Sequence, residues 1–86
     1  MIKCVIVIDG AVAELIYVSS WDEAISVNNA VTTIARYAPQ LVVRVWAGES
    51  GDLSDFAEIN AGDDAKRMVD VESSVVLDDI RARIEG

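Results

Sequence analysis

The side chains that perform most enzyme chemistry are scarce in this sequence. Its 86 residues include no histidine and a single cysteine, Cys4. Without histidine, Ser-His and Cys-His nucleophilic pairs and the usual neutral-pH general base are excluded. The segment "GESGD" (48–52) resembles a G-x-S-x-G nucleophile turn, but it ends in Asp52 and no histidine is present to activate Ser50. Cys4 lies in an apolar run, which favours a buried, inert thiol. We therefore expect no catalytic residue and no enzymatic activity.

Metal ligands are equally limited. One cysteine without histidine cannot form a tetrahedral zinc site. Calcium prefers carboxylates, but an EF-hand loop needs oxygen ligands at its first, third and fifth positions and glycine at its sixth. A loop starting at Asp52 places Phe56 fifth, and one starting at Glu58 places Asp63 sixth. A glycine-rich phosphate loop is also absent. We expect no metal and no cofactor.

The remaining chemistry is negative charge, and it is concentrated in one segment. Residues 48–86 carry eleven acidic and four basic side chains, whereas residues 1–47 carry four and three. Such a field repels nucleic acid and anionic membranes and attracts basic protein surfaces. We expect a basic protein partner, with no direct nucleic-acid contact and no membrane contact. Six acids occur between Arg44 and Lys66 without a basic residue among them: Glu49, Asp52, Asp55, Glu58, Asp63 and Asp64.

Two strands and a helix are predicted before this segment. Residues 2–8 and 12–19 are rich in β-forming residues and flank Asp9-Gly10, a dipeptide that suits the positive φ angles of a hairpin turn. A helix is expected between Ser20 and Pro39, because Ser20 and the glutamate three residues later match a capping box and proline ends a helix. Its predicted apolar face holds Ala24, Val27, Val31, Ile34 and Ala38.

The third strand and the C-terminal region complete an α+β prediction. Residues 41–47 alternate, with Arg44 and Trp46 on one face. The resulting ββαβ core is a small antiparallel sheet of order 2-1-3 packed by one helix. We expect one domain over 1–86: the core at 1–47, an acidic turn or short helix at 48–65, and 66–86. Within the last part, 66–72 fits a strand or a helix, and a C-terminal helix buries Val76, Leu77, Ile80 and Ile84.

Composition indicates a folded cytoplasmic protein. Apolar residues make up 52% of the chain, and its longest apolar runs are far shorter than the roughly 20 residues that span a bilayer. No signal-peptide pattern is present, and a lone cysteine fits a reducing compartment.

Two interpretations of the acidic segment remain open. The acids could simply keep a small apolar domain soluble. Alternatively, a helix over 52–59 would align side chains three residues apart, about 5–6 Å from each other. That spacing is comparable to the spacing of phosphates, so the ridge would fit the basic groove of a nucleic-acid-binding protein. Phe56, if exposed, and Trp46 or Tyr37 would supply apolar anchors. Core packing is the alternative for Phe56 and Trp46, and it is favoured for Phe56.

The capped helix "SSWDEA…ARYAP", the strand "LVVRVW" and the acidic remainder are together similar to small acidic inhibitors encoded by phages and mobile elements, of the anti-CRISPR kind. The resemblance is one of size, charge and architecture. It implies an inhibitor that mimics DNA, and it assigns no residue a role. The alternative is a small structural or regulatory module that forms a homodimer through a sheet edge or its C-terminal helix, with the acids serving solubility.

Overall fold

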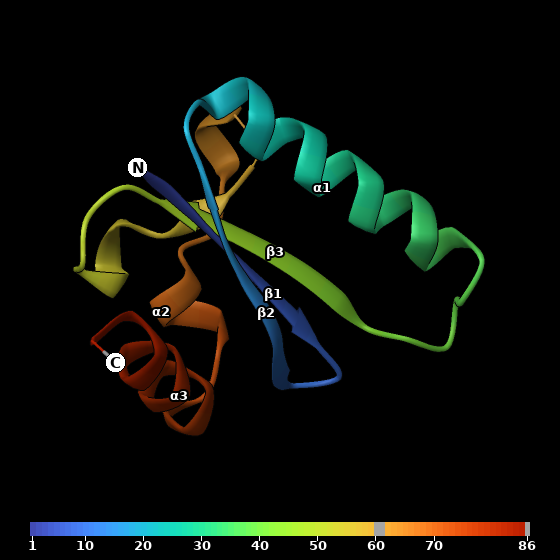
Figure 1. The fold of residues 1–86 in the computed structure, drawn as a ribbon. Helices are drawn as coiled ribbons and strands as arrows, with labels where there is room; N and C mark the ends of the chain where they lie inside the picture. Colours follow the sequence, from blue (N-terminus) through green and yellow to red (C-terminus); the bar gives the residue numbers. More distant parts are fainter. Residues whose placement is uncertain (60–61, 86) are drawn as a thin grey trace.

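The computed structural model describes residues 1–59 and 62–85, except for the side chain of Asp63. The fold is α+β, as predicted (Figure 1). It contains, in chain order, β1 (Ile2–Ile8), β2 (Ala11–Val18), α1 (Trp21–Arg36), β3 (Val43–Gly48), the 3-10 turn η1 (Leu53–Asp55), β4 (Ala57–Glu58), the 3-10 turn η2 (Gly62–Asp64), α2 (Met68–Val71) and α3 (Ser74–Glu85).

The sheet is antiparallel with strand order β2-β1-β3-β4. The three predicted strands therefore occur in the predicted order 2-1-3, and a fourth strand lies beyond them. The hairpin between β1 and β2 turns at Asp9 and Gly10, whose φ angles are 51° and 77°. β2 contains a bulge, because the register passes from Glu14 opposite Ile6 to Val12 opposite Val7.

The segment after β3 differs from its prediction. One interpretation of the sequence predicts a helix over 52–59, but η1 is only three residues long and the chain then forms the two-residue strand β4. Residues 66–72 were predicted to form a strand or a helix, and each occurs over part of this range. Arg67 bridges to Ala57 on the outer side of β4, and the following residues form the one-turn helix α2.

The predicted capping box of α1 is confirmed with one variation. Ser20 Oγ accepts a 3.2 Å hydrogen bond from the backbone N–H of Glu23. The Glu23 carboxylate accepts from the backbone N–H and the hydroxyl of Ser19, one residue further back than in the usual box. The helix ends at Arg36, with Tyr37 as its C-cap, so it stops before Pro39.

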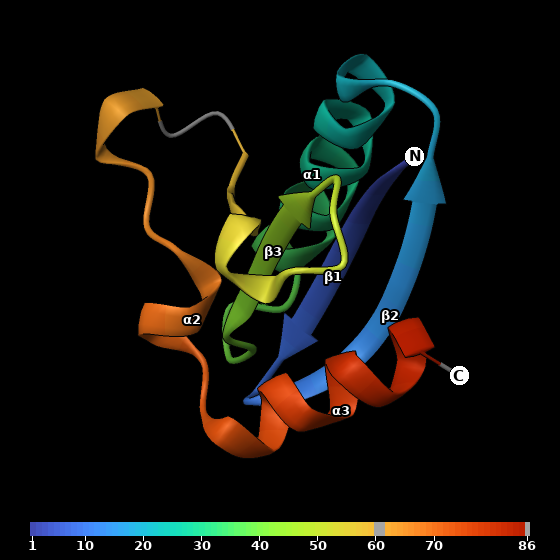
Figure 2. The same cartoon turned by 90° about the vertical axis from the view of Figure 1, so that its left-hand side faces the viewer.

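Helices cover both faces of the sheet (Figure 2). α1 lies on one face over a cluster of Ile2, Cys4, Val18, Ala24 and Ala47. α2, α3 and η1 lie on the other, where the larger cluster consists of Val5, Val7, Trp46, Leu53, Phe56, Met68, Val76 and Ile80. β1 contributes to both clusters because successive side chains of a strand point to opposite faces.

The predicted inner faces of the helices are confirmed for α3 and only in part for α1. Val76 and Ile80 are buried, and Leu77 and Ile84 pack against the same cluster. In α1, burial declines along the helix from Ala24, which is fully buried, to Ile34, which is 67% exposed. Within residues 1–59 and 62–85, the predicted apolar face of α1 is therefore only partly covered over its second half, where Val31 is half-buried and Ile34 is exposed. No helix in these residues is long and apolar enough to cross a bilayer.

A candidate acidic protein-binding surface

Three of the predicted site residues lie together at the turn between β3 and β4. Glu49, Asp52 and Asp55 are exposed, and we call this group the acidic corner. The turn is anchored by Leu53 and Phe56, which are 3% and 0% exposed. Because apolar and acidic residues alternate here, burying the apolar ones directs the carboxylates outward.

The absence of a side chain at Gly48 lets the backbone pack closely against Phe56 where the chain enters this turn. An added Cβ at Gly48 would lie 2.8 Å from the ring of Phe56, a separation that real side chains do not tolerate. The ring therefore rests directly on the backbone at the end of β3. This contact fixes where the acidic corner begins, and it confirms the prediction that Phe56 belongs to the core. The interpretation of Trp46 as an apolar anchor is wrong, because Trp46 is 0% exposed.

Each carboxylate of the acidic corner accepts a hydrogen bond from a neighbouring side chain or backbone group. Asp52 Oδ1 accepts from the backbone N–H of Ser54 at 3.0 Å and from its hydroxyl at 2.8 Å. These bonds, the backbone one first, lower the pKa of Asp52, so the side chain is ionised at neutral pH. Asp55 accepts from the hydroxyl of Ser50. The carboxylates are therefore held in place rather than free to rotate.

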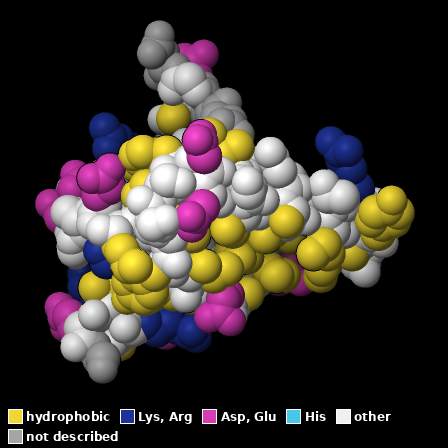
Figure 3. Space-filling view, turned by 45° about the horizontal axis from the view of Figure 1, so that its top comes forward, with side chains coloured by type: hydrophobic (Ala, Val, Ile, Leu, Met, Phe, Trp, Pro, Cys, Tyr) yellow, Lys and Arg dark blue, Asp and Glu magenta, His cyan; other side chains and the backbone are white. Residues whose placement is uncertain are grey.

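The first turn of α1 extends the negative surface. Trp21 Nε1 donates a 3.0 Å hydrogen bond to Glu49 Oε1, which ties the start of the helix to the acidic corner. Asp22 and Glu23 lie in this turn. Hydrogen bonds from Ser19 lower the pKa of Glu23. Figure 3 shows acidic side chains mainly over the left-hand part of one face, and apolar side chains running along its right-hand part.

Basic side chains approach the acidic corner from distant parts of the chain. Lys3 Nζ donates to the backbone oxygen of Glu49 at 3.0 Å, and Arg67 Nη1 donates to that of Ser54 at 3.1 Å. Both bonds end on carbonyl oxygens, so they position the turn and leave the carboxylates available. The ion pairs in the described part of the chain use other acids, namely Glu72, Asp78 and Asp79.

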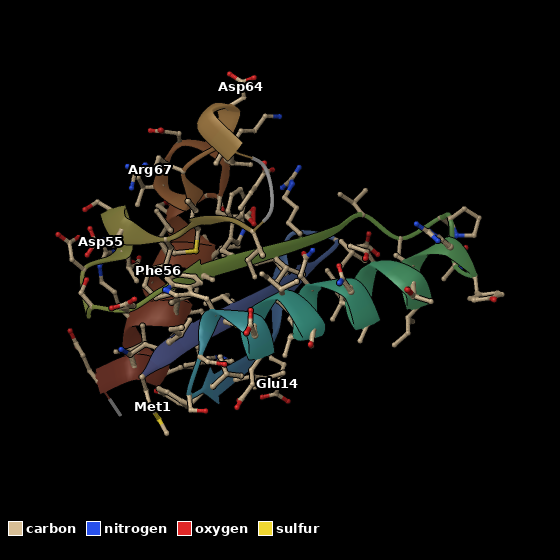
Figure 4. All side chains as sticks on the ribbon, turned by 90° about the horizontal axis from the view of Figure 1, so that it is seen from above. Met1, Glu14, Asp55, Phe56, Asp64 and Arg67 are labelled. Atoms are coloured by element: carbon tan, nitrogen blue, oxygen red, sulfur yellow. The ribbon has the colours of Figure 1, made fainter. Side chains whose placement is uncertain are left out.

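The other predicted site residues do not join this group. Glu58 is half-buried in β4, and Asp64 is exposed on η2. Figure 4 shows Asp55 and Asp64 on separate segments. The side chain of Asp63 lies outside the described part. The helical ridge predicted over 52–59 is thus wrong, because η1 ends at Asp55 and the chain then becomes extended.

Sequence reasoning missed a buried carboxylate, Glu72. Its side chain is 2% exposed, and its two oxygens accept from Arg44 Nη1 at 3.0 Å and from Trp46 Nε1 at 2.9 Å. The available signal was the alternation that places Arg44 and Trp46 on the same face of β3, because a buried indole N–H on that face needs an acceptor. With both oxygens occupied, Glu72 serves the fold.

The surface of the described residues contains a shallow groove. It has a volume of about 260 Å³ and lies between α1 and the outer side of β3. Its lining residues are Asn28, Thr32, Val43, Arg44, Val45, Glu58 and Ile59. No group of three or more histidine, cysteine, aspartate or glutamate side chains in the described ranges is arranged to hold a metal ion.

The fold and the surface define a class: a small α+β protein with a four-stranded antiparallel sheet between helices and an acidic corner at one end. The chain matches none of the protein-family models, curated proteins or solved structures with which it was compared.

Proposed function

We propose that this protein is a non-enzymatic inhibitor that binds the basic groove of a nucleic-acid-binding protein or complex through its acidic corner. Its action would resemble that of anti-CRISPR proteins that mimic DNA, and its setting would be the reducing cytoplasm. The observation that supports this function is the exposure of Glu49, Asp52 and Asp55 on one ordered turn, with each carboxylate held by a hydrogen bond.

Ordered carboxylates suit this role for a physical reason. A basic groove built for phosphates presents fixed Lys and Arg side chains, and a partner with fixed anions loses little conformational freedom on binding. The net charge of −8 would speed association with such a groove, and salt would weaken it. Asp22 and Glu23 on α1 widen the negative surface without requiring the predicted helical ridge.

The test compares two variants with the same net charge. The corner variant carries Glu49→Gln, Asp52→Asn and Asp55→Asn. The control carries Glu14→Gln, Asp70→Asn and Glu85→Gln at exposed positions on β2, α2 and α3. Each immobilised protein is incubated with cell lysate at low and at high salt, and the retained proteins are identified. A captured nucleic-acid-binding protein is then purified and assayed for displacement of its DNA or RNA.

We expect the wild type and the control to capture the partner at low salt and to displace its nucleic acid. The corner variant should lose both properties. Equal capture by both variants would show that total charge, rather than the acidic corner, attracts the partner. Capture without displacement would refute inhibition by mimicry.

A further inference from the structure

A second surface lies at the opposite end of α1, and its composition differs from that of the rest of the chain. No acidic residue occurs from Ala24 to Gly48, although the protein carries 15 acids in all. The charged residues of this stretch are Arg36 and Arg44. The stretch comprises most of α1, the connection to β3 and β3 itself, so these elements add no negative charge to the surface.

Large apolar side chains are exposed on this part. Ile34 is 67% exposed, Tyr37 87% and Val42 54%. They come from the second half of α1 and from the connection to β3. A helix of 16 residues is about 24 Å long, and its burial is greatest in the first half, at Ala24. Figure 1 shows the far end of α1 and the following connection projecting on the right, away from α2 and α3.

The neighbouring edge of the sheet is open. Among the described residues, β4 covers β3 at Trp46 and Ala47 alone, whereas β1 pairs with the other side of β3 along its whole length. Within the described residues, the outer side of β3 from Val43 to Val45 therefore has no strand partner. The groove of about 260 Å³ lies beside this stretch and is lined by Val43, Arg44 and Val45 among others.

The other edge of the sheet is protected and this one is not. β2 has a bulge and the exposed charge of Glu14, two features that discourage pairing between sheet edges. The open stretch of β3 is regular in its register with β1. Its one charged side chain, Arg44, is bonded to Glu72 on the α2 side of the sheet. The edge formed by β3 is therefore better suited than the edge formed by β2 to accept another strand.

We propose that the open edge of β3 and the exposed half of α1 form a twofold interface between two copies of this chain. β3 would pair antiparallel with β3 of the second copy, which joins the two sheets into one. The exposed halves of the two α1 helices would then cover the same face of that joined sheet.

Charge selects a second copy as the occupant. Two chains that each carry −8 repel one another, and the repulsion is least where the approaching stretches of α1 and β3 contain no acid. The acid that lines the neighbouring groove, Glu58, is half-buried in β4. Antiparallel pairing about a twofold axis also needs only one kind of edge, which every copy supplies. A standard interface buries roughly 800 Å² per partner, a modest part of the 5158 Å² surface of this chain.

This interface is independent of the acidic corner, so either proposal can fail alone. The test is sedimentation equilibrium of the wild type and of two single variants over a wide range of protein concentrations and salt. Ile34→Glu adds charge to the exposed half of α1, and Val75→Glu adds the same charge at a position on α3 that is 76% exposed. Both positions are exposed, and circular dichroism verifies that both variants fold.

We expect the wild type and Val75→Glu to reach twice the monomer mass of 9.3 kDa and to remain dimers at high salt. Ile34→Glu should raise the dissociation constant by about tenfold or more, as a charge in the centre of an interface does. Amide hydrogen exchange gives a second readout, because outward N–H groups of 43–45 should become protected in the dimer only.

A wild type that stays monomeric up to about 1 mM, weaker than most specific association, would overturn the proposal. A dimer that Ile34→Glu leaves intact would overturn it as well. So would a dimer that is lost instead with Tyr17→Lys on β2, since that result would place the contact at the opposite edge of the sheet.

Discussion

Glu72 Oε2 accepts a 2.9 Å hydrogen bond from Nε1 of Trp46, a residue 26 positions earlier in the chain. The second oxygen of Glu72 accepts from Arg44, two residues before the tryptophan on the same face of β3. One carboxylate thus satisfies a buried indole and neutralises a guanidinium. It also ties the end of α2 to the centre of the sheet, which positions α3 over the larger core cluster.

Replacing this carboxylate should destabilise the fold. Glu72→Gln keeps the shape but leaves one oxygen to serve two donors, and its amide N–H₂ faces a donor. We expect a loss of about 1–3 kcal/mol in the free energy of unfolding, the usual cost of an unsatisfied buried polar group. Urea denaturation followed by circular dichroism measures it. Asp70→Asn, at an exposed position of α2, is the control and should change stability by less than about 0.5 kcal/mol. A Glu72→Gln protein as stable as this control would show that the network contributes little.

The contact between Gly48 and Phe56 predicts a second effect. Gly48→Ala would place a methyl group 2.8 Å from the ring, so the ring or the strand end must move. Overpacking of this kind costs about 1–3 kcal/mol. Gly51→Ala is the matched control, because no heavy atom lies within 4 Å of its added Cβ. Thermal unfolding of both variants checks the prediction, which requires the melting temperature of Gly48→Ala to fall well below that of Gly51→Ala.

The capping box predicts how stability depends on pH. Hydrogen bonds from Ser19 lower the pKa of Glu23 below its ordinary value of 4.5. A carboxylate whose pKa is lower in the folded state than in the unfolded state stabilises the fold above the unfolded pKa. That contribution disappears as the pH falls through the folded pKa.

Glu23→Gln should therefore be less stable than the wild type at pH 7, and the difference should shrink as the pH falls below 4.5 through the folded pKa of Glu23. Urea midpoints across this pH range provide the measurement, with Asp70→Asn in parallel. A difference that stays constant with pH would mean that Glu23 acts through packing or helix propensity rather than through its charge.

Cys4 provides a test of the core beneath α1. The side chain is 0% exposed, and burial raises the pKa of its thiol. A disulfide reagent should therefore react with the native protein only through unfolding, about a thousandfold or more slower than with the chain in urea. Rapid labelling under native conditions would show that α1 opens locally from the sheet.

Local signals in the sequence predict much of this fold. Asp9-Gly10 determined the hairpin, Ser20 with Glu23 the start of α1, and the alternation through Arg44 and Trp46 the faces of β3. Each of these signals depends on residues close together in the sequence. The tertiary contacts therefore leave the predicted local structure unchanged. The inner face of α3 follows from helical periodicity for the same reason.

Features that depend on contacts between distant segments could not be predicted in this way. β4 is only two residues long and exists because the chain returns at Arg67 to pair with Ala57. Glu72 meets its partners only when α2 packs beneath β3. The spacing of acids from Glu49 to Glu58 suggested a continuous helix, but burial of Leu53 and Phe56 bends the turn inward and separates Glu58 from the acidic corner.

The hydrogen bond from Trp21 to Glu49 makes the protein its own spectroscopic probe. The chain has two tryptophans: Trp46 is wholly buried, and Trp21 is 46% exposed beside the acidic corner. Their fluorescence emission should separate, with a blue component from the core and a red component from the surface. Acrylamide should quench the red component, which comes from Trp21. If binding at the acidic corner shifts this component and leaves the blue one constant, fluorescence reports the binding without any attached dye.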